Sequence, residues 1–228
     1  MGWGWGAGGC RGARRGFGSL RGVAHPYPLA GVRVLDMARV VAGPFAGRML
    51  SDLGADVVKV EPPDGDVTRL WGEVRHGLSG FYTQQNAGKR NVSIDLKHPD
   101  GAALVLHLAA RADVLIENFR PGTMARYGLD YATLSARNPR LVMLSVTGFG
   151  QDGPNADRMV YAPVIHAEAG LIQRQASFDG LFTDPVMSIA DSTSALHALS
   201  GILAALLHRQ RTGKGQFIDL SMFDAMLA

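Results

Sequence analysis

Short apolar runs alternate with helix-forming segments from residue 29 onward, and this alternation limits the possible folds more than any other feature of the sequence. Strands are predicted over Val32–Asp36, Asp56–Glu61, Ile94–Leu96, Asp113–Glu117, Leu141–Val146 and Phe217–Leu220. Helices are predicted over Phe45–Leu53, Pro99–Arg111, residues 123–137 and Ser192–Thr212. Strands that alternate with helices at this spacing imply a mostly parallel sheet with helices on both faces. The predicted fold class is therefore α/β, with a Rossmann-like sheet.

Two segments lack a periodic pattern and are expected to be irregular, residues 64–91 and residues 147–190. The second of them contains Gly148, Gly150, Gly153 and Pro154 within a few positions, and such a density of glycine and proline favours loops. A further helix is expected to begin near Met222. Because the chain stops inside this helix, we expect a truncated chain.

The positive net charge of the chain resides in its first 28 residues. These contain four arginines and no acid, so the remaining 200 residues hold 19 of the 23 bases and all 20 acids, a net charge of −1. A nearly neutral body argues against nucleic-acid binding. No apolar run approaches ~18 residues, so no membrane helix is predicted. A single cysteine, Cys10, fits a reducing compartment and excludes an internal disulfide.

Residues 1–28 are predicted to be a disordered or targeting-like tail rich in glycine and arginine. The segment is basic and free of acids, as transit peptides are, but it holds only one serine, which favours a plain tail. The predicted location is the cytoplasm, with the mitochondrial matrix as the alternative if the segment is a transit peptide. Residues 4–9 match G-x-G-x-x-G, yet no strand precedes them, so no nucleotide site is predicted there.

Asp191 directly precedes the long predicted helix and is expected to be its N-cap residue. A carboxylate at this position faces unpaired backbone N–H groups and the positive end of the helix dipole. One interpretation is a helix cap alone. The other is a nucleophile that attacks a thioester carbonyl and forms a mixed anhydride, while the N–H groups stabilise the oxyanion. The spacing of the residues does not separate these interpretations.

Short motifs follow one another in a fixed order along residues 29–228. They include Val34-Leu35-Asp36, Gly43-Pro44, Leu53-Gly54-Ala55-Asp56, Gly65-Asp66-Val67-Thr68-Arg69, Asn86-Ala87-Gly88-Lys89-Arg90, Glu117-Asn118-Phe119-Arg120-Pro121-Gly122, Thr147-Gly148-Phe149-Gly150, Ala190-Asp191 and Arg211-Thr212-Gly213-Lys214-Gly215. Each motif is weak alone, but in this order they resemble the family III coenzyme A-transferases of the CaiB/BaiF type.

The resemblance implies that residues 29–228 are the large domain of such an enzyme, with the smaller domain absent from this chain. It implies transfer of coenzyme A between an acyl-CoA donor and a small carboxylic acid acceptor. By position, Asp191 is the aspartate that becomes a mixed anhydride and then an aspartyl-CoA thioester. Coenzyme A is then a substrate, no metal is required, and the full-length protein is expected to be a homodimer.

The resemblance also assigns contacts with coenzyme A. The residues are Val40, Val41, Lys89, Arg90, Asn118, Phe119 and Arg126. Lys89 and Arg90 are expected in a surface loop near phosphate. Asn118 and Phe119 follow a strand, at the edge where parallel sheets bind ligands. Val40 and Val41 are expected to act through their backbone near the thioester.

Two positions at which the sequence differs from related enzymes limit the reactions that we expect of this protein. Formyl-CoA:oxalate-type members carry a glutamine where this chain has Val41, which disfavours so small and anionic an acceptor. The related racemases carry a Gly-His-Asp stretch where this chain reads Met159–Pro163, and His166 is interpreted as a structural histidine. Within the family, succinyl, mesaconyl or citramalyl groups are the expected acyl groups.

Three alternatives remain open at the level of sequence. The first is a relative of the acyl-CoA racemases, and the second is an inactive fragment that binds coenzyme A. The third is an NAD(P)-binding dehydrogenase in which Glu61 would bind the ribose, although the glycine triad of such enzymes is absent after the first strand.

Overall fold

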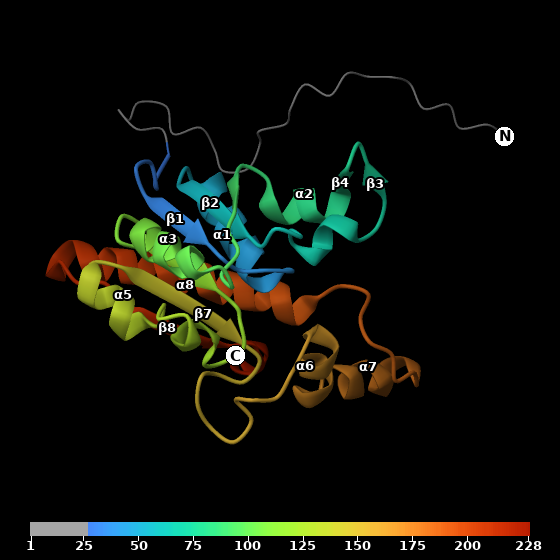
Figure 1. The fold of residues 1–228 in the computed structure, drawn as a ribbon. Coiled ribbons are helices and arrows are strands. Elements are labelled where there is room, and N and C mark those ends of the chain that lie inside the picture. Colours follow the sequence, from blue (N-terminus) through green and yellow to red (C-terminus); the bar gives the residue numbers. More distant parts are fainter. Residues whose placement is uncertain (1–26) are drawn as a thin grey trace.

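A computed structural model describes residues 27–228, so the tail predicted over residues 1–28 lies outside the described residues except for its last two positions. Six strands form one sheet in the order β5-β2-β1-β6-β7-β8 (Figure 1), and every neighbouring pair is parallel. The strands are β1 Arg33–Asp36, β2 Asp56–Glu61, β5 Arg90–Ser93, β6 Val114–Glu117, β7 Val142–Thr147 and β8 Phe217–Ser221. The predicted α/β fold class is confirmed.

The strand order places a topological switch point between β1 and β6. From β1 the chain continues outward to β2 and β5, and it then returns to the other side of β1 to form β6, β7 and β8. The connections that leave β1 and β6 therefore diverge at the carboxyl edge of the sheet. Parallel α/β sheets bind their ligands in the crevice that opens at such a point.

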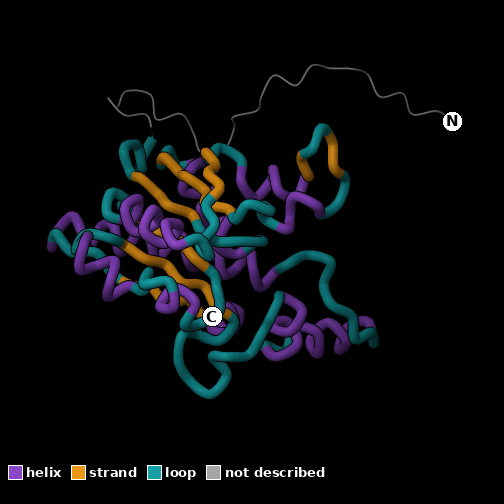
Figure 2. Tube along the Cα trace, viewed as in Figure 1, coloured by secondary structure: helices purple, strands orange, loops and turns teal. Residues whose placement is uncertain are grey.

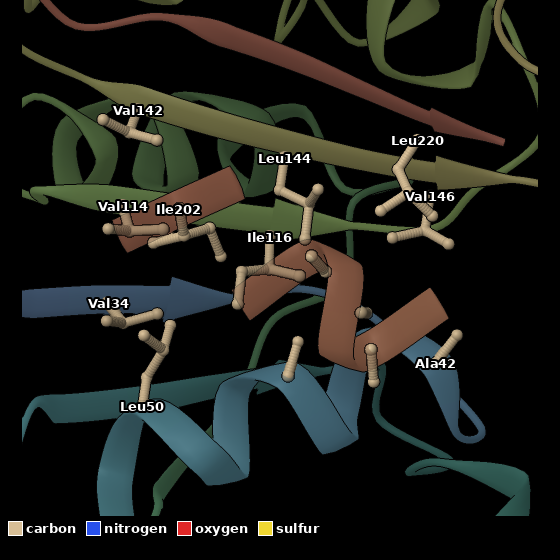
Figure 3. Close-up of a cluster of buried hydrophobic side chains, with 14 of the residues drawn as sticks. Val34, Ala42, Leu50, Val114, Ile116, Val142, Leu144, Val146, Ile202 and Leu220 are labelled. Carbon is tan, nitrogen blue, oxygen red and sulfur yellow. The ribbon is translucent and has the colours of Figure 1, made fainter. Parts of the chain in front are cut away.

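Helices cover both faces of the sheet. Helices α1 Ala42–Asp52 and α8 Ile189–Thr212 pack on one face, together with α9 Met222–Leu227. Figure 3 shows the apolar core between them, where Val34, Val114 and Ile116 of the sheet meet Leu50 of α1 and Ile202 of α8. Because successive side chains of a strand point to opposite faces, Leu115 enters the second core instead, which is covered by α3 Pro99–Ala109 and α5 Tyr131–Arg137.

Both segments predicted to be irregular contain helices. Within residues 64–91 lie the 3-10 turn η1 Val67–Leu70, a hairpin of β3 Val74–Arg75 and β4 Leu78–Ser79, and α2 Gly80–Asn86. Within residues 147–190 lie α6 Ala162–Glu168 and α7 Leu171–Asp179, which Figure 2 shows as two helical segments set apart from the sheet. These helices are at most nine residues long. They are too short to produce the repeated apolar period on which the predictions depended.

Two further elements differ from the predictions. The strand expected over Ile94–Leu96 lies instead at Arg90–Ser93, where it pairs with β2. The helical stretch expected over residues 123–137 is divided into α4 Thr123–Arg126 and α5, because Gly128 between them adopts a positive φ of 66°. Glycine is the residue that most readily adopts this conformation.

Helix α8 is long and apolar enough, by length and composition alone, to cross a membrane. In this fold it packs against α1, β7 and β8, and one of its faces is buried in the core. A core helix of a globular protein passes the same compositional test. Gly213, with φ of 75°, ends the helix as predicted.

Candidate active site

Asp191 lies in the first turn of α8. The prediction that it is the N-cap residue is wrong, because α8 begins at Ile189 and Ser188 is the N-cap. Burial raises the pKa of Asp191 to about 6, while the nearby backbone N–H of Ala42 acts in the opposite direction. A carboxylate in this setting is ionised at neutral pH, yet it is more basic than an exposed aspartate.

Two helix N-termini meet at this carboxylate. Ala42 is the first residue of α1, and α1 packs along α8. Neither N-cap residue, Val41 or Ser188, supplies a side-chain capping hydrogen bond. The first N–H groups of a helix have no partner within the helix and carry the positive end of its dipole. The start of α1 therefore offers donors for negative charge that develops beside Asp191, whereas the N–H groups of Ile189 and Ala190 in α8 are bonded to Met187 and His166.

A buried ion pair fixes the loop between β1 and α1. Lys59 Nζ donates to the carbonyl oxygen of Ala38 at 2.7 Å and lies 3.2 Å from Asp66 Oδ2. The same carboxylate oxygen accepts the backbone N–H of Val40 at 3.2 Å. Val40 has a φ of 68°, a left-handed conformation that is strained for a β-branched residue. The surrounding hydrogen bonds hold the loop in this conformation.

Asn118 and Phe119 follow β6 and contact this loop across the switch point. Asn118 and Arg39 exchange two hydrogen bonds, each of 2.8 Å, between the side-chain amide and the backbone. The Arg39 guanidinium lies 5.7 Å from the centre of the Phe119 ring. The structure therefore brings four of the predicted cofactor residues to the carboxyl ends of β1 and β6, namely Val40, Val41, Asn118 and Phe119.

Lys89 does not lie on the surface, and the prediction that it does is wrong. Its ammonium group pairs with Asp36 at 2.6 Å and donates to the Pro44 carbonyl at 2.7 Å and to Asn86 Oδ1 at 2.9 Å. The side chain is 1% exposed. Burial lowers the pKa of Lys89, and the adjacent Asp36 carboxylate opposes that change. All three donors of the ammonium group are thus used inside the protein, where they hold the first turn of α1 against β1.

The remaining two predicted cofactor residues lie apart from the cluster. Arg90 opens strand β5 instead of lying in a loop, and it makes a bidentate pair with Asp56 at 2.5 and 3.1 Å. Both residues stand at the beginning of their strands, so they lie at the edge of the sheet opposite Asn118. Arg126 ends α4, is exposed, and lies 3.4 Å from Thr123 Oγ1. Contact of either arginine with a cofactor stays a prediction.

Glu61 is not free to bind a ribose. Its carboxylate accepts two hydrogen bonds from Arg69, at 2.7 and 2.9 Å, one from the backbone of Asp66 at 2.8 Å, and further ones from Tyr82 and Asn91. Burial opposes ionisation of this group, but the hydrogen bonds from Arg69 and Tyr82 outweigh it and lower the pKa of Glu61 to about 2. The dehydrogenase alternative therefore loses the acid on which it depended.

A small cavity lies at the ends of β6 and β7. It has a volume of about 100 Å³ and is lined in part by Glu117, Arg120, Ser145 and Gln151. Burial raises the pKa of Glu117 to about 7, against the hydrogen bonds from Ser145 and the Phe119 backbone, which lower it. Within residues 27–228, no three side chains of His, Cys, Asp or Glu converge as a metal site would require.

Two residues that support the site, Arg39 and Asp66, were not identified as such from the sequence. They hold the β1–α1 loop through partners that lie 79 and 26 positions away along the chain. His166, interpreted from the sequence as a structural histidine, is buried and contacts the first turn of α8. No local periodicity can reveal such contacts. For Asp66, the available signal was its place in the Gly65–Arg69 motif.

Comparison with known proteins identifies relatives of this chain. Residues 29–228 match the family described as CoA-transferase family III. The chain is 44% identical over 209 residues to the succinate–glutarate CoA-transferase of Agrobacterium fabrum, an alignment that covers 88% of this chain and 52% of that protein. It is 42% identical to the succinyl-CoA–L-malate CoA-transferase beta subunit of Chloroflexus aurantiacus, covering 91% of this chain and 52% of that one.

A solved structure of a CAIB/BAIF family protein from Brucella suis matches with a TM-score of 0.84 and 42% identity, covering 88% of this chain and 55% of that one. The chain thus spans about half the length of the curated relatives that it matches.

Proposed function

Since this chain belongs to CoA-transferase family III, we propose that the protein transfers coenzyme A from an acyl-CoA donor to a small carboxylic acid, with Asp191 as the acyl-accepting nucleophile. One observation carries this proposal. The Asp191 carboxylate stands in the first turn of α8, beside the first backbone N–H group of α1, at the ligand-binding edge of the sheet. A structural cap would not need a second helix N-terminus directed at it.

The first half of the reaction converts the Asp191 carboxylate into a mixed anhydride and then into a thioester with coenzyme A. The carboxylate attacks the thioester carbonyl, the carbon–sulfur bond breaks, and coenzyme A leaves as a thiolate while a mixed anhydride forms. The thiolate then attacks the Asp191 carbonyl of the anhydride. This step releases the donor acid as a carboxylate and leaves an aspartyl-CoA thioester.

The second half reverses these steps with the acceptor. The incoming carboxylate attacks the aspartyl thioester, expels the thiolate and forms a new mixed anhydride. The thiolate attacks the acceptor carbonyl, which yields the new acyl-CoA and regenerates the Asp191 carboxylate. No water and no external proton donor enters the balance. In each step an oxyanion develops near Asp191, where the backbone N–H groups that open α1 can stabilise it.

Coenzyme A itself is proposed to lie across the switch point. Val40 and Val41 would face the thioester through their backbone, and the Phe119 ring and the Asn118 amide would line the groove beside them. The cations proposed to attract the phosphates are Arg39 and Arg126, because both are exposed whereas Lys89 is buried in its pair with Asp36.

The proposed acyl groups are four- and five-carbon dicarboxylates. The relatives named above act, by their names, on succinate, glutarate, succinyl-CoA and L-malate. We propose succinyl-CoA as the donor. We also propose that the full-length protein is a homodimer, as the resemblance to this family implies.

The proposal is tested by incubating the purified chain with succinyl-CoA and glutarate and measuring glutaryl-CoA by liquid chromatography and mass spectrometry. We expect glutaryl-CoA to form with ping-pong kinetics and the activity to be lost in Asp191→Asn. The matched control is Asp224→Asn, another carboxylate in the first turn of a helix, which should remain active. Equal activity in Asp191→Asn and the wild type would contradict the proposal.

The second candidate is a fragment that binds coenzyme A without turnover. It is favoured by one fact, the coverage of only about half of each relative. Calorimetric titration with coenzyme A separates the two cases. Binding without glutaryl-CoA formation, in a chain whose circular dichroism shows a folded α/β protein, would establish this second candidate.

A further inference from the structure

His166 is buried on α6 and makes hydrogen bonds through both ring nitrogens. Its Nδ1 lies 2.8 Å from Asp184 Oδ1, and its Nε2 accepts the backbone N–H of Ala190 at 3.0 Å. The side chain is 1% exposed. An amide N–H can only donate, so Nε2 must present its lone pair and the ring proton must reside on Nδ1, facing the Asp184 carboxylate. The two contacts thus select one tautomer of the neutral imidazole.

The Ala190 N–H is one of the donors that a helix leaves unpaired at its beginning. Ala190 is the second residue of α8 and directly precedes Asp191. Ser188, the N-cap residue, makes no side-chain hydrogen bond to this turn. The imidazole therefore fulfils the part that a capping side chain usually plays, but it is supplied by a different helix. In this way α6 is connected to the turn that carries the carboxylate.

Asp184 lies in the segment between α7 and α8, where the neighbouring apolar side chains Leu181, Phe182, Val186 and Met187 are exposed. Such a segment has little packing of its own to fix its path. The contact with His166 attaches Asp184 to a buried group, and the carboxylate in return keeps the Nδ1–H tautomer. If the proton moved to Nε2, an N–H would face the Ala190 N–H and the cap would be lost.

We propose that His166 and Asp184 form a positioning unit for the nucleophile: the imidazole, oriented by Asp184, caps Ala190 and thereby fixes the first turn of α8 so that the Asp191 carboxylate faces the α1 N-terminus. His166 acts through Ala190 and is a positioning residue, because its Nε2 is directed at a backbone N–H and not at the reacting atoms. The catalytic part of this inference rests on the proposed function, whereas the cap itself does not.

The chemistry of the pair predicts which substitutions preserve it. Glutamine in place of His166 offers an oxygen for the Ala190 N–H and an amide donor for Asp184, so His166→Gln should retain the unit. Phenylalanine fills the ring volume but has neither group, so His166→Phe should lose it. Asp184→Asn keeps an acceptor oxygen for Nδ1–H, whereas Asp184→Ala removes it. Asp184 is partly exposed, so its variants test the unit even if His166→Phe fails to fold.

The first experiment measures the rate at which succinyl-CoA acylates Asp191, trapped with hydroxylamine, in each variant. Because a misplacement of the nucleophile of about 1 Å can cost on the order of 100-fold in rate, we expect His166→Phe and Asp184→Ala to lower the maximal rate by about 10- to 100-fold. The succinyl-CoA concentration at half-maximal rate should stay within about threefold of wild type, since the binding residues lie elsewhere. His166→Gln and Asp184→Asn should remain close to wild type.

The matched control is His197→Phe. His197 is also on α8, but it is exposed and bonds only to the Thr193 carbonyl of its own helix. It should leave the rate unchanged. An equal rate in His166→Phe and the wild type would overturn the inference while leaving the proposed function intact. A loss in His166→Gln as large as that in His166→Phe would also overturn it.

The second experiment detects the hydrogen bond between His166 and the Ala190 N–H without any enzymatic turnover. Nitrogen-15 NMR should show the proton of His166 on Nδ1, and amide exchange of Ala190 should be slow in the wild type and in His166→Gln but faster in His166→Phe. If succinyl-CoA does not acylate the wild type, the proposed function fails and this measurement still decides the cap. A proton on Nε2, or unchanged exchange of Ala190 in both His166→Phe and Asp184→Ala, would overturn the cap.

Discussion

At the scale of single residues, the chemistry of this site depends on how burial and hydrogen bonding tune two carboxyl groups. Asp191 stands beside the N-termini of two helices, and burial still raises its pKa to about 6. Glu117 is more deeply buried, and its pKa rises to about 7. The first group is therefore an anion at neutral pH, while the second is close to its midpoint of ionisation.

The raised pKa of Asp191 predicts the pH dependence of its acylation. Below about pH 6 the carboxyl group is protonated and is a poor nucleophile, so the rate of acylation by succinyl-CoA should rise with pH and level off above about pH 7. The rate is measured in single turnover, with all samples quenched in hydroxylamine at one fixed pH. A flat profile between pH 5 and 8, or a midpoint near that of an exposed aspartate, would contradict this account of the site.

The raised pKa of Glu117 predicts a pH-dependent cost to stability. The folded state keeps this proton up to about pH 7, whereas a glutamate in the unfolded chain releases it near 4.5. As pH rises through this window, the free energy of unfolding of the wild type should fall relative to that of Glu117→Gln, by up to about 3 kcal/mol. Urea unfolding at pH 5 and pH 8 measures the change. The control Glu73→Gln, at an exposed position, should show no such difference. An equal response in both variants would contradict the claim that Glu117 is protonated in the folded state.

At the scale of the elements, two buried ion pairs hold the segment that connects β1 to α1. Lys59 with Asp66 fixes the loop, and Lys89 with Asp36 fixes the first turn of the helix. Helix α1 can approach the second pair only because position 47 is a glycine. A Cβ atom there would lie 2.6 Å from Asp36 Oδ2 and 3.2 Å from Lys89 Nζ.

Alanine at position 47 should therefore destabilise the protein even though alanine favours helices. Gly47→Ala forces the buried pair to move and should reduce the free energy of unfolding by about 1–3 kcal/mol. The matched control is Gly201→Ala in α8, where the new Cβ would meet Ile218 at an ordinary 3.5 Å. That variant should be neutral or more stable by up to about 1 kcal/mol, because of helix propensity. Urea unfolding measures the stability of both variants. Similar effects at the two positions would contradict the close approach of α1 to the Lys89–Asp36 pair.

The elements also show which parts of the fold could be predicted from the sequence. The strand Asp56–Glu61 matches its prediction residue for residue, and α3 and α8 differ from theirs by at most three residues at either end. These segments have a clear period or clear end signals. The short helices α2, α6 and α7 have local end signals, such as Ser79 at the N-cap of α2 and Gly180 at the C-cap of α7. They are too short to show the repeated apolar period on which the helix predictions depended.

At the scale of the whole molecule, the order of the strands assembles the site from distant segments. Residues that follow β1, residues that follow β6, and the start of α8 meet at one edge of the sheet. The sequence motifs predicted Asn118 and Phe119 for this edge, and the resemblance predicted Asp191 as the nucleophile. They could not predict that Lys89 is buried, because its partner Asp36 lies 53 positions away and only the folded sheet brings the two together.

The fold also explains why the nucleophile is placed by several elements at once. Asp191 belongs to α8, its nearest helix N-terminus belongs to α1, and the proposed cap of its turn comes from α6. A change in any of these elements should therefore affect the reaction.

The most direct test of the central claim is peptide mass spectrometry of the chain after reaction with succinyl-CoA and a hydroxylamine quench. The account predicts a hydroxamate on the peptide that contains Asp191, present in the wild type and in Asp224→Ala and absent in Asp191→Ala. A hydroxamate on another carboxylate that persists in Asp191→Ala, or a folded wild-type chain without any hydroxamate, would contradict the assignment of Asp191 as the nucleophile.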